Sequence, residues 1–304
     1  MSTVNESKDA RNLKLTSEPL VPAGPVSGFV GGTVDSVRGV WQYRELLDLL
    51  VRRELKSRYK DSALGFLWSL IRPLTQLLVY YVAIGKFLGA ERSIPDFAVY
   101  IFTGLTAWTL FSEIVSSGTG SIVANGGLVK KIYLPREVFP LSVIGSAIFN
   151  FVIQFAILFI ATLVAGYPPT IVGLGYVLLG TVLLLVYATG AAFLLSAVNV
   201  YLRDVQYLVE VVLMVGFWLS PIVYAWSFVN TAVQSAFLNN LYLANPVTLA
   251  VLAFQRGMWG AGADLPQPTD LGLRMVIALL IGIPVLWLCQ RVFARLQNNF
   301  AQEL

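Results

Sequence analysis

Long apolar stretches alternate with short polar segments along most of this 304-residue chain. A helix needs about 20 consecutive, mainly apolar residues to cross the hydrocarbon core of a bilayer. Six stretches approach or exceed that length: Leu64–Gly85, Phe97–Val115, Val138–Ala165, Ile171–Val198, Val205–Trp226 and Leu271–Val292. The pattern therefore predicts an all-α polytopic membrane protein with six transmembrane helices.

The segment between the fifth and sixth stretches has a different pattern. Residues 227–270 are not polar throughout, and the apolar run Leu249–Phe254 is bracketed by Asn245–Pro246 and Gly257. A run of this length is too short to span and is typical of a re-entrant or interfacial helix. We expect one or two re-entrant helices dipping into the outer leaflet, with a helix in an external loop as the alternative.

The chain before the first apolar stretch divides into two parts. Residues 1–36 are polar and rich in Ser, Pro and Gly, so we expect a disordered cytoplasmic tail. Residues 37–62 show apolar positions at helical spacing, which predicts an amphipathic interface helix on the membrane surface that also serves for docking. A helix packed on a protein partner is the alternative. Residues 63–304 form the predicted transmembrane domain. The candidate residues of the interface helix are Arg52, Arg53, Lys56, Arg58 and Tyr59.

Composition excludes several classes of protein. The chain is 57% hydrophobic and 12% charged, whereas soluble domains have about 25% charged residues. It has no histidine and a single cysteine, Cys289, so catalysis by histidine and cysteine-based zinc sites are excluded. We predict neither a catalytic residue nor a metal site in this chain.

The distribution of basic residues predicts the orientation. With both termini in the cytoplasm, the cytoplasmic segments carry sixteen Lys and Arg and the external segments carry four, while Arg72 lies within the first stretch. Basic residues concentrate on the cytoplasmic side of membrane proteins. The net charge of +4 therefore reflects topology and partner docking, and no nucleic-acid partner is expected.

Several local motifs occur in a fixed order. They are R-Y-K-D-S-A-L-G-F-L-W at Arg58–Trp68, K-K-I-Y-L-P-R-E-V-F-P at Lys130–Pro140, N-V-Y-L-R-D-V at Asn199–Val205, S-P-I-V-Y at Ser220–Tyr224, and Asn245–Pro246. Together they resemble the membrane (permease) subunit of type-2 ABC transporters that export polysaccharide, the O-antigen, teichoic-acid and galactan exporter group. Arg72 departs from this pattern, in which the corresponding position is usually uncharged.

The resemblance implies an assembly as well as a fold. It implies a homodimer in the inner membrane with two copies of an ABC nucleotide-binding subunit, and a polyprenyl-diphosphate-linked glycan moved through the dimer interface. No G-x-x-x-x-G-K-[ST] motif is present, so we expect ATP and Mg to bind the partner subunit and this chain to be a transport subunit rather than an enzyme. The coupling helix implied by the resemblance comprises Lys130, Lys131, Tyr133, Leu134, Pro135, Arg136 and Glu137.

Pro135 suits the first turn of such a coupling helix, with Glu137 near its N-terminus; a loop that only fixes orientation is the alternative. Intramembrane charges usually pair or face a polar cavity. Arg72 either pairs with Glu113 or Glu210, or meets the diphosphate of the substrate. The resemblance implies that the first and fifth spans line the channel, and aromatic residues that face lipid or the membrane interface are the alternative. The candidate channel residues are Trp68, Arg72, Tyr80, Tyr81, Phe217, Trp218 and Tyr224, and the candidate structural charges are Glu113, Arg203, Asp204 and Glu210.

The glycan itself is left open by these motifs. We expect a cell-wall galactan or an O-antigen-like chain, and the alternative is a type-2 ABC exporter of drugs or lipids. Arg203 and Asp204 lie at the inner end of the fifth stretch and form either a second cytoplasmic contact or a structural anchor.

Overall fold

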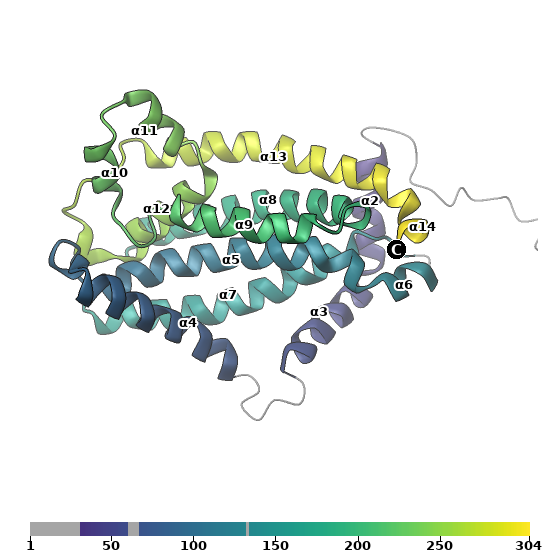
Figure 1. The fold of residues 1–304 in the computed structure, drawn as a ribbon, viewed down its shortest axis with the longest axis horizontal. Coiled ribbons are helices and arrows are strands. Elements are labelled where there is room, and N and C mark those ends of the chain that lie inside the picture. The colour runs from purple at the N-terminus through teal and green to yellow at the C-terminus, as the bar shows by residue number, and fades with distance from the viewer. Residues whose placement is uncertain (1–30, 60–66, 132–133) are drawn as a thin grey trace, which may run out of the picture.

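The computed structural model describes residues 31–59, 67–131 and 134–304, and its long helices lie side by side along one axis (Figure 1). Among these residues, four helices are long and apolar enough to cross a membrane, or five if a bent pair counts as one span, and no strand is present. This agrees with the predicted all-α class and with a polytopic membrane protein. The number of six spans stays a prediction. The four helices are α5 (Phe97–Ala124), α7 (Val138–Val164), α8 (Ile171–Tyr201) and α13 (Leu271–Leu296).

The first and fifth predicted spans are shorter or less regular than the other four. Helix α4 (Trp68–Tyr80) continues as the π-helix η2 (Tyr81–Phe87). At Gly85 a Cβ atom would lie 2.7 Å from a ring carbon of Phe97, so glycine lets this segment approach α5 closely. Helix α9 (Val205–Trp218) has 14 residues and ends eight residues before the predicted boundary.

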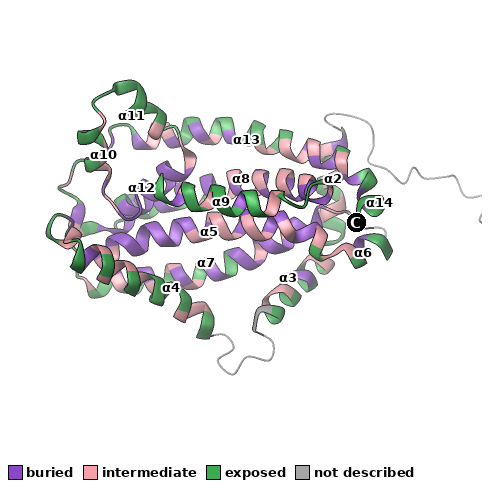
Figure 2. Cartoon of the chain, in the orientation of Figure 1, coloured by how far each residue is buried: buried purple, intermediate pink, exposed green. Residues whose placement is uncertain are grey.

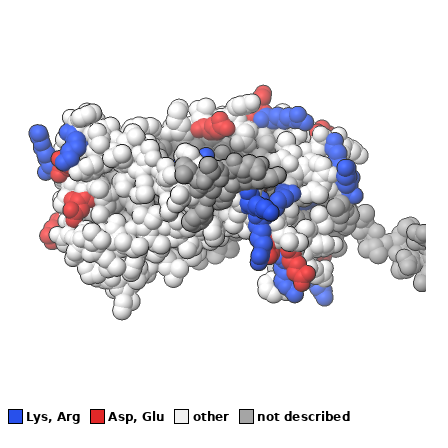
Figure 3. All heavy atoms as spheres, turned by 90° about the horizontal axis from the view of Figure 1, so that it is seen from below, with Lys and Arg blue, Asp and Glu red and all other residues white. Residues whose placement is uncertain are grey.

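The short helices gather at the two ends of the bundle. At one end lie α2 (Gly31–Gln42), α3 (Arg44–Tyr59), α6 (Gly126–Lys131) and α14 (Phe300–Glu303) together with the C-terminus (Figure 1). On the face that Figure 3 shows, Lys and Arg side chains lie toward the two ends, and a band almost free of charge separates them. Helix α2 begins at residue 31, within the segment that we expected to be a disordered tail.

The opposite end holds α10 (Trp226–Ala232), α11 (Ala236–Tyr242) and the 3-10 turn η3 (Ala90–Arg92). In the turn between η2 and α5, Nζ of Lys86 lies 2.9 Å from a carboxylate oxygen of Glu91. This hydrogen bond raises the pKa of Lys86.

Helix α12 (Pro246–Met258) returns from this end into the bundle and is buried along almost its whole length. An 80° bend separates it from α11, the geometry expected of a re-entrant hairpin or a broken span. Asn245 caps it, since its side chain accepts a hydrogen bond from the Val247 amide at 3.0 Å, and proline follows at the first helical position. The Asn245–Pro246 motif is therefore a helix start.

The contact between α12 and α8 depends on two glycines. A Cβ atom on Gly257 would lie 2.4 Å from the carbonyl oxygen of Gly173, and one on Gly173 would lie 2.8 Å from the carbonyl oxygen of Gly257. No larger side chain fits at either position without moving a helix. Figure 2 shows the buried residues concentrated on α5, α8 and α12, with exposed positions along α4, α9 and α13.

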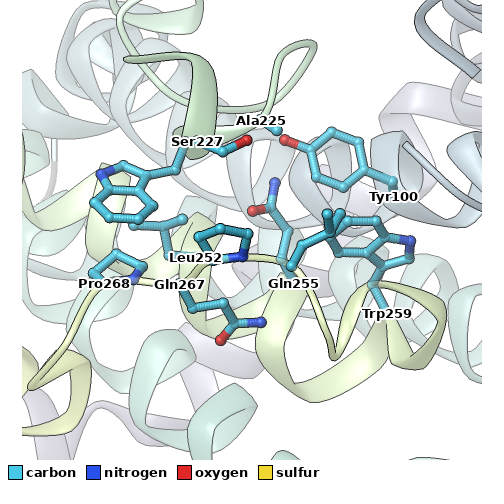
Figure 4. A pocket seen from close by; sticks show the side chains of 11 residues that line it. Tyr100, Ala225, Ser227, Leu252, Gln255, Trp259, Gln267 and Pro268 are labelled. Carbon is cyan, nitrogen blue, oxygen red and sulfur yellow. The ribbon is translucent and has the colours of Figure 1, made fainter. Parts of the chain in front are cut away.

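The segment Leu219–Ala225, after α9, is not helical although much of it is buried. Its carbonyl groups are bonded by side chains from two other helices. The hydroxyl group of Tyr100, on α5, lies 2.7 Å from the carbonyl oxygen of Tyr224 and 3.0 Å from the carbonyl oxygen of Pro221. The Gln255 amide of α12 donates to the same Pro221 oxygen at 2.6 Å. Figure 4 shows Tyr100 and Gln255 side by side. Unpaired backbone groups are costly at membrane depth, so these two side chains permit α9 to end inside the protein.

The Tyr100→Phe variant tests this support. It removes the hydroxyl group and leaves the Tyr224 carbonyl without this hydrogen bond. For a buried carbonyl, this lowers the free energy of unfolding by about 1–3 kcal/mol. We expect a lower midpoint of thermal unfolding for the detergent-purified full chain. The control is Tyr207→Phe, at a position that is 69% exposed on α9. Equal midpoints for the two variants would contradict the assigned role of Tyr100.

Candidate functional site

A polar groove of about 1010 Å³ lies between α4, α5, α7 and α9. Side chains of all four helices, together with Glu54 of α3, form its walls. Most of these side chains carry a hydroxyl, amide or charged group, in helices whose other faces are apolar. The lining residues are Glu54, Trp68, Ser69, Arg72, Pro73, Gln76, Thr109, Ser112, Glu113, Ser116, Ser117, Asn150, Gln154, Glu210 and Leu213.

The groove brings together the three ionisable residues that the sequence placed within the spans. Arg72 comes from α4, Glu113 from α5 and Glu210 from α9. One carboxylate oxygen of Glu113 accepts a hydrogen bond from the Asn150 side chain at 2.8 Å. Among the described residues no ion pair joins Arg72 to either glutamate. The three charges therefore share a polar cavity, one of the two arrangements that we expected for intramembrane charges.

Two amides of α7 form part of the wall that the sequence analysis missed. Asn150 and Gln154 lie four residues apart, so they lie on the same helical face, and they are 9% and 5% exposed. A detectable signal was present: two amides at this spacing inside a 27-residue apolar helix. Amides both donate and accept hydrogen bonds, which suits a wall that contacts hydroxyl groups.

The predicted aromatic channel residues divide between the groove and the core. Trp68 lines the groove and is 40% exposed. Phe217 is 7% exposed and packs between Tyr80 and Trp108, with ring centroids 5.6 and 5.7 Å apart. Phe217 therefore supports the wall from behind rather than facing the groove.

Three other predicted aromatics, Tyr81, Trp218 and Tyr224, lie at or just after the ends of α4 and α9. Trp218 is 54% exposed, and its carbonyl oxygen accepts a hydrogen bond from the Tyr224 hydroxyl at 2.7 Å. The ring of Tyr81 lies 5.3 Å from Nζ of Lys86. None of these three residues lines the groove.

The interface helix packs on the protein itself. Leu50 of α3 is buried, and Val51 lies against α7 where Gly145 leaves room, since a Cβ there would be 2.7 Å from Val51. The helix therefore packs on its own chain, and the expected contacts with the membrane surface and with a protein partner, which are compatible with each other, stay predictions. The basic residues face outward: Arg52 pairs with Asp48 at 2.8 Å and Lys56 is exposed.

The basic side of α3 also contacts the C-terminal end of α5, because Arg53 donates a hydrogen bond to the side chain of Asn125, the C-cap residue of α5. Arg58 and Tyr59 are the last residues of α3, and their side chains lie outside the described part of the structure.

The predicted coupling segment has a different local structure from the one expected. The short helix is α6, which ends at Lys131, so it precedes Pro135 instead of beginning there. Residues 134–137 form coil and turn and lead directly into α7, of which Glu137 is the N-cap residue. The Arg136 guanidinium lies 5.6 Å above the ring of Phe300. Lys130 and Lys131 are exposed, Leu134 is partly buried, and Tyr133 lies outside the described residues.

A single hydroxyl joins this segment to both terminal parts of the chain. Ser36 of α2 donates to the Glu137 carboxylate at 3.2 Å. The same oxygen accepts from the Gln290 amide at 3.0 Å and from the Arg291 guanidinium at 3.5 Å. One donor and two acceptor positions are the full capacity of a hydroxyl group. Since Glu137 and Arg291 are only 4% and 8% exposed, Ser36 bridges two buried groups of opposite charge.

We name Ser36, Glu137, Gln290 and Arg291 the clasp. The sequence analysis missed three of its members, because Ser36 was assigned to the tail, and Gln290 and Arg291 to the end of the last span. Pro135 also packs against α2: a Cβ atom added at Gly39 would lie 3.6 Å from the ring of Pro135. The clasp holds the segment after α6 between the first described helix and the last long one.

Arg203 and Asp204 are exposed at the start of α9. The Asp204 side chain makes no capping hydrogen bond. The two proposed roles of this pair, docking and anchoring, stay predictions.

Comparison with known proteins agrees with this architecture. Residues 45–259 match the ABC-2 type transporter family, so the chain belongs to that family. It is 30% identical over 272 residues to the O-antigen export system permease protein RfbA of Myxococcus xanthus, covering 88% of this chain and 98% of that protein.

Two further relatives agree. A protein of the same name from Klebsiella pneumoniae is 29% identical, with 86% of this chain and 95% of the relative covered. The polysialic acid transport protein KpsM of Escherichia coli is 26% identical, with 78% and 90% covered. The resemblance to type-2 ABC permeases is thereby confirmed.

Replacing Ser36 with alanine tests the clasp. The variant leaves the Glu137 carboxylate and the Arg291 guanidinium buried with one fewer partner each, at a cost of about 1–3 kcal/mol. We expect a lower unfolding midpoint and faster proteolysis near residue 135. Ser57→Ala is the control, because its hydroxyl is exposed and bonds only to its own helix at 2.8 Å. If both variants unfold like the wild type, the clasp contributes no stability.

Proposed function

We propose that this chain is the permease subunit of an ATP-driven ABC exporter that moves a lipid-linked polysaccharide across the inner membrane. The observation that carries the proposal is the groove, whose walls combine an arginine, carboxylates, amides and an aromatic ring at membrane depth. The names of the relatives, which are permeases for O-antigen and polysialic acid, support a glycan as the cargo.

Each part of the groove fits one part of such a substrate. The Arg72 guanidinium can bind a diphosphate through two parallel hydrogen bonds. Asn150 and Gln154 can exchange hydrogen bonds with sugar hydroxyls, and Trp68 offers an apolar face to a sugar ring. By this reading the groove receives the diphosphate and the first sugars, and the chain is a polyprenyl-diphosphate-linked galactan or an O-antigen-like glycan.

The assembly that we propose has two copies of this chain and two copies of an ABC ATPase, which binds ATP and Mg. The exposed basic residues of α3 and α6 would dock the ATPase, and the clasp would pass its movement to α2, α7 and α13. Helices α4 and α9 leave large apolar side chains exposed, among them Leu78 at 60% and Val212 at 59%. A second copy of the chain would cover these faces and close the groove into a channel.

Depletion of this chain tests the proposed function. Lipid-linked glycan should accumulate inside depleted cells, and surface glycan should fall as the protein disappears. Changed drug resistance or lipid composition, with surface glycan intact, would contradict the proposal and would instead indicate the drug or lipid exporter.

Complementation of the depleted strain tests Arg72. Since no ion pair holds Arg72 to Glu113 or Glu210, we expect Arg72→Gln to lower export about tenfold with unchanged protein level, because a charge-assisted contact is lost. Arg72→Lys should restore part of the activity, and Arg92→Gln, at the outer end, should export normally. A fall in protein level together with export would assign Arg72 a structural role.

Cysteine labelling tests the proposed orientation. In a Cys289→Ser background, a membrane-impermeant maleimide should label Gln234→Cys in intact spheroplasts, because residue 234 follows α10 at the outer end. Lys56→Cys, on α3, should be labelled only after permeabilisation. The reverse pattern would place α3 outside and overturn the topology with both termini in the cytoplasm.

A further inference from the structure

A second polar pocket, of about 220 Å³, lies at the end opposite the clasp. It is bounded by α10, α11, the segment Gln267–Thr269 and the first turn of α13. It is separate from the groove, and the two share no lining residue. Gln267 and Pro268 also line the smaller neighbouring pocket seen in Figure 4. The residues that line the second pocket are Trp226, Asn230, Ala236, Asn239, Asn240, Leu243, Gln267, Pro268, Thr269 and Arg274.

The lining of this pocket is suited to a sugar ring. Three asparagines, a glutamine and a threonine surround it, and each of these side chains can both donate and accept hydrogen bonds. Sugar hydroxyls have the same double capacity. The Trp226 indole supplies an apolar face and one N–H donor. The volume of the pocket is close to that of a single ring, so it would hold one sugar of a longer chain.

Two buried atoms in the pocket wall have no partner among the described residues. They are the indole Nε1 of Trp226, a donor, and Oδ1 of Asn239, an acceptor. Buried polar atoms are nearly always hydrogen-bonded, and exceptions call for an explanation. Both residues line the pocket, so these two atoms are wall groups whose hydrogen-bonding capacity the described part of the protein leaves unused.

The pocket is held in shape by its own hydrogen bonds. The Asn239 amide of α11 donates to the Asn230 side chain of α10 at 2.6 Å. Arg274 of α13 donates to the Asn240 side chain at 2.8 Å. These bonds tie three elements together across the pocket, so binding a ligand would not require the walls to be assembled first.

The charge of the pocket selects the kind of sugar. Arg274 is the sole charged residue among those that line it, and no ion pair with a described carboxylate neutralises its guanidinium. A guanidinium forms its strongest hydrogen bonds with carboxylates and phosphates. A ring with an acidic substituent would therefore bind better than a neutral one.

We propose that this pocket binds a sugar ring bearing an acidic group, on the glycan chain as it leaves the protein at the outer end. The proposal rests on the proposed function, since it requires a glycan to pass this end. It adds a binding site outside the groove, and of the two cargoes proposed above it favours an O-antigen-like chain that carries acidic sugars over a neutral galactan.

Binding to the full-length protein in phosphatidylcholine nanodiscs tests the proposal, with trigalacturonic acid as the acidic probe and galactotriose as the neutral one. Saturation-transfer NMR should show the acidic trisaccharide bound about tenfold more tightly, because one charge-assisted contact is added. Arg274→Gln should abolish this preference, and Arg274→Lys should keep part of it. Trp226→Phe should weaken both probes, provided that its unfolding midpoint matches the wild type.

Arg256→Gln is the matched control, because Arg256 is an exposed arginine on α12 whose guanidinium lies over the ring of Tyr176, outside the pocket. It should leave binding unchanged. Equal binding of the two probes, no binding, or a preference that survives Arg274→Gln would overturn the proposal. Displacement of the acidic probe by phosphatidylglycerol in the nanodisc would identify a lipid headgroup site instead.

This binding assay uses neither the ATPase nor transport. A negative result would therefore remove the outer site and leave the proposed export function to stand or fall on the depletion experiment.

Discussion

The fold depends on how backbone groups are bonded where helices end inside the protein. The carbonyl of Pro221 has two donors within reach, the Tyr100 hydroxyl and the Gln255 amide. These come from α5 and α12, so the end of α9, the most buried of the four long helices and α12 hold one another in place. Without such donors, a non-helical segment at membrane depth would carry unpaired polar groups. The close contact of Gly173 with Gly257 then fixes how deeply α12 enters.

The same rule explains why polar residues can line the groove. A charge in contact with lipid is costly, whereas one that faces a polar cavity with hydrogen-bonding neighbours is tolerated. Asn150 bonds Glu113 directly, and the aromatic stack of Tyr80, Phe217 and Trp108 supports the wall from the apolar side. The helix bundle thereby holds a hydrophilic groove between helices whose other faces are apolar.

The clasp ties together the end of the bundle that holds α2, α6 and α14. Ser36 connects the segment after α6 to α2 and α13, and its hydroxyl has no hydrogen-bonding capacity left for water. A partner that pushes on this end would therefore move several helices together. The two ends of the helix bundle differ in their chemistry, since the clasp joins opposite charges whereas the pocket at the other end has Arg274 as its one charged lining residue, without an ion pair to a described carboxylate.

The sequence determined the helical class, the four long spans and the family, because these follow from hydrophobic periodicity and from motifs that are contiguous in the chain. It also located the helix start at Asn245–Pro246. The tertiary structure decided that Arg72, Glu113 and Glu210 line one groove without an ion pair. It also decided that Tyr100 bonds to Pro221 and that Ser36 bonds to residues more than 100 and 250 positions away. It also placed α6 before Pro135 and ended α9 early. These features depend on side chains brought together by packing, which local patterns do not encode.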